Sequence, residues 1–197
     1  MSGKWLIYRY WDQMMRVREN VELALMCVTV LWIIYFVGLM LPFDPRSYGI
    51  RPRRVDGLVG LIASPFIHAG PAHLLSNSMA LAALLSISLM YSRKLTLEVV
   101  IISALIGGGF VWLLGGGNTV HIGASGVIFG LIGYLLTMGL FRRELLALGV
   151  SLVVSLCYGS TLFSLFVVLP GVSWSGHFFG FASGVLAAWL TKGDITR

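Results

Sequence analysis

Four long stretches of the chain contain no Asp, Glu, Lys or Arg, and this feature limits the possible folds more than any other. They cover residues 23–41, 57–92, 99–141 and 145–191, which are 19, 36, 43 and 47 residues long. A helix needs about 20 apolar residues to cross a bilayer. Because 57% of the residues are hydrophobic and only 11% are charged, the sequence predicts a membrane protein rather than a soluble domain.

The lengths of these stretches predict six spanning helices. The first stretch holds one helix, and the third and fourth each hold two, joined by turns at GGGNT (115–119) and LPGVS (169–173). The second holds only one, because Pro65, Gly70 and Pro71 break a helix in its first half. We expect an all-α membrane protein with one domain, 1–197, a tail over about 1–20, and spans at about 22–41, 73–91, 97–115, 124–141, 145–168 and 175–191.

The positions of the basic residues predict the orientation, because Lys and Arg in short loops are retained on the cytoplasmic side. A cytoplasmic N-terminus and six spans place ten of the fourteen basic residues inside: Lys4, Arg9, Arg16, Arg18, Arg93, Lys94, Arg142, Arg143, Lys192 and Arg197. The other four, Arg46, Arg51, Arg53 and Arg54, lie in one loop of roughly 30 residues, which we expect to be structured. We predict a multi-pass protein of a plasma (inner) membrane with both termini in the cytoplasm.

Charge and cysteine content argue against several classes of partner. The net charge is +6, but the basic residues lie at span ends rather than in one patch, so we expect no nucleic-acid partner. Cys27 and Cys157 fall within apolar spans, where a thiol is most often a small hydrophobic group, and they indicate neither a disulfide nor a metal site. We therefore expect the lipid bilayer as a partner, and neither a metal nor a cofactor.

Polar residues open the second, fourth and sixth spans, which all enter the membrane from the outer side. HLLSN contains His73 and Asn77, GASG contains Ser125, and SGHFFGFASG contains His177. The four side chains are therefore expected at a similar depth. Ionisable groups cost about 2 to 3 kcal/mol or more inside a bilayer, and by default they mark a functional site that faces the protein interior.

Each of these residues also has an interpretation without catalysis. Ser125 could bond the carbonyl one turn back, as serines in spans often do. His177 could be a packing residue at the interface. Gly176, Gly180 and Gly184 could form a seam of small residues for helix contact, which is the commonest meaning of such spacing.

The spacing of the glycines nevertheless favours a catalytic pair. His177 lies on the helix face that otherwise lacks side chains, because Gly180 and Gly184 follow it at i+3 and i+7. The fourth span has matching glycines at residues 126 and 130, so the two helices can approach closely. Such an approach could bring the Ser125 hydroxyl within hydrogen-bond reach of His177, as a nucleophile and its base. Imidazole, with a pKa of about 6.5, suits that task near neutral pH.

The eight acidic residues all lie in loops, in tails or at span ends, so we expect a dyad in which packing holds His177. Attack on a carbonyl creates an oxyanion, and losing one preorganised donor to it costs roughly 3 to 4 kcal/mol. His73 and Asn77, at i and i+4 on one face, can supply such donors, and a backbone N–H at the start of the fourth span can add another. Gly123 and Gly126 would let that backbone approach a substrate.

These motifs together resemble the rhomboid family of intramembrane serine proteases, in its basic six-helix form. The matching segments are GIRPR, PFIHAGPAHLLSN, GASG and GHFFGFASG. The resemblance covers nearly the whole chain, and it implies a six-helix rhomboid bundle that cleaves transmembrane segments through an acyl-enzyme. It also implies Ser125 as nucleophile, His177 as base, His73 and Asn77 in the oxyanion hole, and no cofactor.

The resemblance also assigns some residues beyond the core motifs. Bacterial members often carry a tyrosine four residues after the serine, stacked on the histidine, where this chain has Phe129; stacking should survive. His68 matches a second histidine of the family, which we interpret as a loop anchor. His121 has no clear counterpart and could compete as base, although we expect it in the preceding loop. GIRPR replaces a Trp-Arg pair found in the first loop of some members.

The family also implies a cavity open to water from the outer side, transmembrane proteins as substrates, and small residues at the cut. Lateral entry would then involve the fifth span and the segment after it, around Phe163, Phe166 and LPGVS. A substrate helix must unwind before attack, which favours Gly or Pro near the cut. Two other classes remain: a non-catalytic relative that binds membrane clients, and a metal or haem protein that uses the four histidines. The latter lacks HExxH.

Overall fold

The computed structural model describes residues 3–142, 144–167 and 171–192, without the side chains of residues 3–8 and 10. Its long helices are α1 Gly3–Leu39, α3 Pro71–Tyr91, α4 Arg93–Ile102, α5 Gly108–Leu114, α6 Ser125–Arg142, α7 Leu145–Leu162 and α8 Trp174–Leu190. A π-helical turn, η4 (Ser103–Gly107), joins α4 to α5 without a break. These described residues form no strand, only an isolated bridge between Ile50 and His121. The predicted all-α bundle is confirmed.

Among the described residues, five helical segments are long and apolar enough to cross a membrane: Trp11–Leu39, Pro71–Tyr91, Arg93–Leu114, Ser125–Arg142 and Leu145–Leu165. The sixth, α8, has 17 residues. At 1.5 Å per residue it is about 25 Å long, close to the thickness of the hydrocarbon core. The helices follow the expected spans closely, except that α1 continues through most of the expected tail. Residues 168–170, with part of the expected LPGVS turn, lie outside the described residues, as do Arg143 and Arg197.

The loop between α1 and α3 is structured, as its length predicted. It contains the short helices η1 (Pro45–Tyr48), η2 (Val55–Val59), α2 (Gly60–Ala63) and η3 (Ser64–Phe66). Asp56 accepts hydrogen bonds from Arg54 and Arg51 at 2.9 and 3.0 Å, and these lower the pKa of its carboxyl to about 2. Arg53 donates to the carbonyls of Leu113 and Gly115 at the end of α5. Local ion pairs and backbone bonds therefore hold this loop over one end of the bundle.

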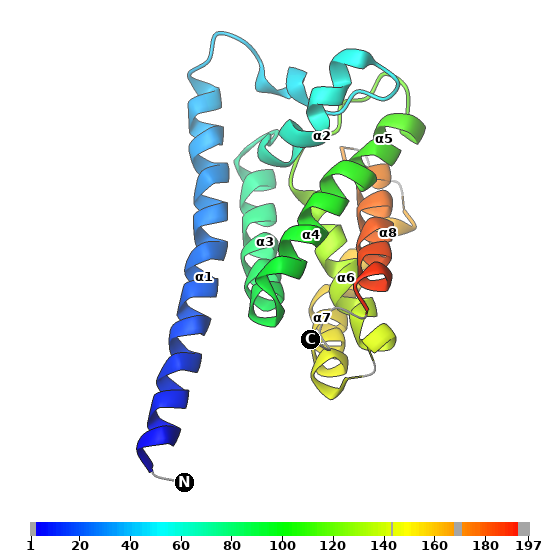
Figure 1. Cartoon of the computed structure of the whole chain (residues 1–197). Coiled ribbons are helices and arrows are strands. Elements are labelled where there is room, and N and C mark those ends of the chain that lie inside the picture. The colour runs from blue at the N-terminus through cyan, green and yellow to red at the C-terminus, as the bar shows by residue number, and fades with distance from the viewer. Residues whose placement is uncertain (1–2, 143, 168–170, 193–197) are drawn as a thin grey trace.

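Helix α6 lies at the centre of the bundle (Figure 1), with α8, α7, α3 and η4 packed around it. Its residues Leu131, Ile132, Leu135 and Met138 are fully buried. Helix α1 stands at one side against α3 and extends past the rest of the bundle. Because α6 is enclosed, the loop that precedes it fixes the position of its first residue, Ser125.

Candidate active site

The backbone immediately before Ser125 is shaped by Gly123, which has a φ of +107°. Residues other than glycine rarely adopt this backbone conformation, so glycine is favoured here. A Cβ at this position would also lie 2.7 Å from His73 Cε1 and 3.4 Å from Asn77 Nδ2. The side chains of His73 and Asn77 therefore lie directly against the segment that leads into α6. The sequence predicted this neighbourhood from depth alone.

The loop between α1 and α3 holds the same segment from its other side. The Gly123 N–H donates to the Ser64 carbonyl at 2.8 Å, and the Ala124 N–H donates to His68 Nε2 at 3.4 Å. His68 is buried, and its Nδ1 has no hydrogen-bond partner. Burial, with a smaller effect from nearby His73, lowers the pKa of His68 to about 4. This environment keeps His68 neutral near pH 7, and its contact with Ala124 agrees with the expected role as an anchor.

The contact between α6 and α8 includes close approaches of backbone to backbone at glycines. A Cβ on Gly180 would overlap the Gly126 carbonyl, and a Cβ on Gly184 would overlap the Gly130 carbonyl. The predicted small-residue approach of the fourth and sixth spans is therefore present. Because the two helices cannot approach more closely, this seam sets the relative positions of Ser125 and His177, which lie at its end nearest the loop between α1 and α3.

His177 is held on its ring face and on one nitrogen. Its ring stacks on Phe129 with centroids 4.1 Å apart and planes 16° apart, as expected for a ring four residues after Ser125. Its Nδ1 lies 3.1 Å from Ser164 Oγ, so packing does not act alone. Ser125 and His177 are both described, and no hydrogen bond joins them in this structure. Catalytic hydrogen bonds often tighten only when substrate binds.

The two candidate oxyanion donors differ in their surroundings. Asn77 is buried, and its amide nitrogen Nδ2 has no hydrogen-bond partner. An unpaired buried donor costs about 1 to 3 kcal/mol, so an acceptor that reached it would be bound favourably. His73 is half-buried and packs edge-on against His68, with ring centroids 5.1 Å apart. The N–H groups in the first turn of α6 have no partner within their own helix, so further donors lie close by.

One cavity of about 1070 Å³ brings the candidate residues together. It is lined by Ser125, His177, His73, Asn77 and Phe129. Residues of the loop between α1 and α3, among them Arg46, also line it. This volume is at the upper end of the range for small-molecule sites, and it can hold an extended segment of a few residues.

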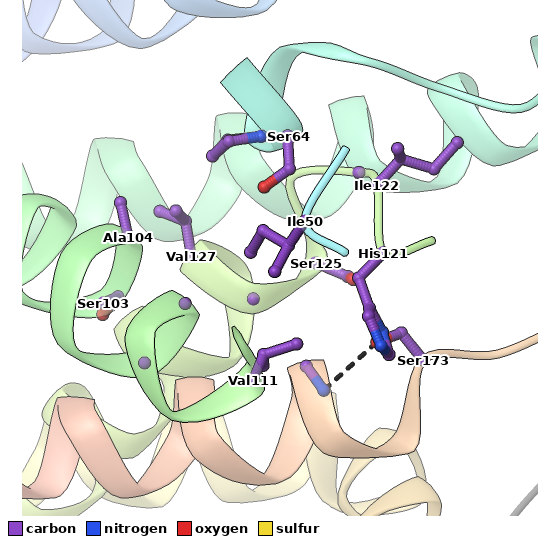
Figure 2. Close-up of a pocket in the computed structure, with 16 residues that line it drawn as sticks. Ile50, Ser64, Ser103, Ala104, Val111, His121, Ile122, Ser125, Val127 and Ser173 are labelled. Carbon is purple, nitrogen blue, oxygen red and sulfur yellow. Dashed lines mark hydrogen bonds between the residues drawn. The ribbon is translucent and has the colours of Figure 1, made fainter. Parts of the chain in front are cut away.

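A second, smaller cavity of about 40 Å³ lies beyond Ser125, between the start of α6, η4 and the start of α8 (Figure 2). Ser103, Ile50 and Val127 are among its lining residues. Its volume is room for one or two water molecules. Ser125 lines both cavities and is therefore accessible from two sides.

His121 lies in the loop before α6, as expected, and both of its ring nitrogens are engaged. Nδ1 is 2.6 Å from Ser173 Oγ, and Nε2 is 2.8 Å from Thr119 Oγ1; Figure 2 shows the ring reaching Ser173. Ser173 is the N-cap of α8 and accepts from the Gly176 N–H. Burial lowers the pKa of His121. His121 therefore ties the loop before Ser125 to the helix that carries His177, and its nitrogens are less free for a role as base.

The sequence reasoning did not assign Ser164 or Ser173. A serine directly before a helix is a readable N-cap signal, so Ser173 could have been found. Ser164 could not, because its partner lies on another helix. Among the described residues, no three His, Cys, Asp or Glu side chains converge as metal ligands.

Comparisons with known proteins place the chain in a family. The profile described as Rhomboid domain matches residues 56–193. The chain is 40% identical over 150 residues to "Uncharacterized protein Rv1337" of Mycobacterium tuberculosis, which covers 72% of this chain and 62% of that protein. It is 34% identical over 132 residues to "Putative rhomboid protease YdcA" of Bacillus subtilis, covering 66% and 65% respectively. The chain thus matches less than two thirds of the length of these two relatives.

Proposed function

The chain belongs to the rhomboid family, and from that premise we propose that it is an intramembrane serine endopeptidase that cleaves transmembrane segments of other proteins. The observation that carries the proposal is the convergence of Ser125, His177, His73 and Asn77 on one cavity of about 1070 Å³. They come from three helices, α3, α6 and α8. Depth in the membrane and helix spacing also predict them as one site.

In the proposed reaction, Ser125 Oγ attacks the carbonyl carbon of the scissile peptide bond while its proton passes to His177 Nε2. The tetrahedral oxyanion then collapses, the C–N bond breaks, and the leaving amine takes the proton from His177. This leaves an acyl ester on Ser125. A water molecule gives its proton to His177 and attacks the ester. The proton returns to Ser125 Oγ as the new carboxyl end departs.

The oxyanion would be stabilised by Asn77, His73 and the backbone N–H at the start of α6. The unpaired, buried Nδ2 of Asn77 supports this role, because it is a donor already free of competing partners. The pressure of both side chains on Gly123 supports it as well. Their donors therefore lie beside the residue that would attack.

A substrate helix hydrogen-bonds its own backbone within the bilayer, so it must unwind locally before Ser125 can reach a carbonyl. This favours substrates with Gly or Pro near the cut. The loop between α1 and α3 lies at the same end of the bundle as the site. The basic residues at the other span ends place the N-terminus in the cytoplasm. The end that carries the site then faces outward, and water enters the cavity from outside.

Cleavage of a fluorescent transmembrane substrate by the purified protein in detergent tests the proposal. We expect Ser125→Ala and His177→Ala to lower kcat by at least about 1000-fold. Asn77→Ala should lower it by about 100-fold or more. Ser155→Ala is the matched control, because the Ser155 hydroxyl is exposed and bonds only within α7. Undiminished cleavage by either dyad variant refutes the mechanism.

Labelling with a fluorophosphonate separates an active enzyme from a relative that binds clients without cutting them. A serine with an activating base reacts, and an ordinary hydroxyl stays inert. We expect one label per chain, at Ser125, and none in His177→Ala. A chain that binds transmembrane segments but takes up no label would be the non-catalytic relative.

A further inference from the structure

A second serine contacts the proposed base, His177, at Nδ1, the ring nitrogen that does not take the Ser125 proton. Ser164 lies in η5 (Phe163–Leu165), the short 3-10 turn that follows α7. Its Oγ is 3.1 Å from His177 Nδ1. The two residues are on different helices, and within the described chain this is the only hydrogen bond that the His177 ring makes.

The hydrogen of the Ser164 hydroxyl is already committed. Its Oγ also lies 2.8 Å from the Thr161 carbonyl oxygen. A carbonyl can only accept, and a hydroxyl has one hydrogen, so the Ser164 O–H donates to Thr161. Its oxygen must then accept from His177. The proton of the neutral imidazole therefore lies on Nδ1, and Nε2 carries a free lone pair.

This tautomer is the one that a base for Ser125 requires. A neutral imidazole with its proton on Nε2 cannot accept the Ser125 proton through that nitrogen. The stack with Phe129 fixes the plane of the ring, but an apolar ring cannot choose between the tautomers. Only a group that bonds a nitrogen can do so. In serine proteases with a catalytic triad, a carboxylate performs this task.

We propose that Ser164 is a positioning residue that accepts the Nδ1–H of His177 and so holds Nε2 unprotonated toward Ser125. This inference rests on the proposed function and replaces a dyad held by packing with a serine-histidine-serine arrangement. When Nε2 takes the Ser125 proton, the imidazolium donates a charge-assisted bond to Ser164 Oγ, which is stronger than the neutral bond. The hydroxyl thus stabilises the charged form that develops during attack.

Kinetics of three variants test the role. A net hydrogen bond contributes about 1 to 1.5 kcal/mol, which corresponds to roughly tenfold in rate. We expect Ser164→Ala to lower kcat by about tenfold with little change in KM. Ser164→Thr, which keeps the hydroxyl, should restore most of it. Ser155→Ala, in the preceding helix α7, should match the wild type. Unchanged kcat in Ser164→Ala, or no recovery with threonine, overturns the proposal.

Nitrogen-15 NMR of histidine-labelled protein gives a readout that does not depend on proteolysis. The two tautomers differ in which ring nitrogen carries hydrogen, and subtraction of a His177→Gln spectrum identifies the signals of His177. We expect a protonated Nδ1 and a bare Nε2 in the wild type, and a mixture or the reverse in Ser164→Ala. A wild-type proton on Nε2, or an identical spectrum in Ser164→Ala, overturns the proposal. If the wild type cuts nothing yet shows the expected tautomer, the proposed function fails while the positioning contact stands.

Discussion

Helices α8 and α7 both pack against α6, but they differ in how closely their backbones approach it. Helix α8 meets α6 through glycines, with backbone against backbone. Helix α7 exposes most of its length, and only 11% of its apolar segment is buried within the chain. The α6–α8 face is therefore fixed at several points by main-chain atoms that cannot move aside, while α7 makes such a contact at Gly139, where a Cβ would lie 2.9 Å from the Ala147 carbonyl oxygen. The candidate nucleophile and base lie across the α6–α8 face, and Ser164 reaches His177 from η5, the turn that follows α7.

The largest expected effect comes from adding one methyl group to the glycine seam between α6 and α8. In Gly180→Ala the new Cβ meets the Gly126 carbonyl, and backbone on both sides prevents relief. We expect a loss of about 3 kcal/mol or more in stability and loss of cleavage. Gly159→Ala on α7, where nothing lies within 4 Å, should be neutral or slightly stabilising. Thermal unfolding in detergent compares the two. Equal melting temperatures would show that the seam is not rigid.

The second-largest expected effect is a loss of folding stability in acid, through the buried side chain of His68. His68 has a pKa of about 4 when folded, lowered mainly by burial, against about 6.5 when unfolded. Between these values the unfolded chain binds a proton that the folded chain does not, so stability falls as pH drops from about 6.5 to about 4. The loss is on the order of 2 to 3 kcal/mol. His121 adds to the same slope, because burial also lowers its pKa.

Unfolding measured across that pH range in wild type and in His68→Gln isolates the His68 contribution. Glutamine can still accept from the Ala124 N–H but does not titrate. We expect a shallower decline in the variant. Parallel curves for the two proteins would contradict the assignment of a buried, neutral imidazole to this position.

A smaller effect should follow from removing the contact between His121 and Ser173, at the end of the seam nearest Ser125. Ser173→Ala removes the N-cap of α8 and the partner of His121 Nδ1. We expect a loss of about 1 to 2 kcal/mol and a modest fall in kcat, because α8 carries His177. His121→Phe should lose a similar part of the stability, and the double variant should lose less than the sum. Full additivity would mean that the two side chains act separately.

The smallest expected effect lies on the α7 side. Ser151 Oγ is 2.8 Å from the Leu135 carbonyl of α6 and also bonds Ala147 within its own helix. Ser151→Ala should cost about 1 kcal/mol at most, and it should loosen α7 without disturbing the α6–α8 seam. Hydrogen exchange of α7 amides, against Ser155→Ala as control, measures it. Faster exchange in α8 as well would mean that the two contacts are not independent.

Several parts of this molecule could be predicted because they follow from local rules. Segments without charge predicted the helices, and the i, i+3, i+7 spacing of His177, Gly180 and Gly184 predicted the face that meets α6. The stack of Phe129 on His177 was implied by the resemblance to the rhomboid family rather than by a local rule. The roles of Ser125, His177, His73 and Asn77 stay predictions until activity is measured.

Other parts could not be predicted, because they join segments with no common spacing. Ser164 reaches His177 from a turn after α7, and His121 reaches Ser173 across more than fifty residues. The expectation that packing alone holds His177 was incomplete for this reason. The Ser164 hydroxyl in TLFSLF has no sequence feature that distinguishes it from the serines of the preceding helix, α7.

The sequence by itself determined that the chain is a helical membrane protein, which residues are polar within the bilayer, and which helix faces lack side chains. A bilayer leaves a backbone few alternatives to helices, so apolar length and glycine spacing are sufficient for these conclusions. Only the tertiary structure decided which nitrogen of His177 is engaged and which donor of Asn77 is left free. Those properties depend on hydrogen-bond distances of about 3 Å between different helices, and such distances are set by packing rather than by local sequence.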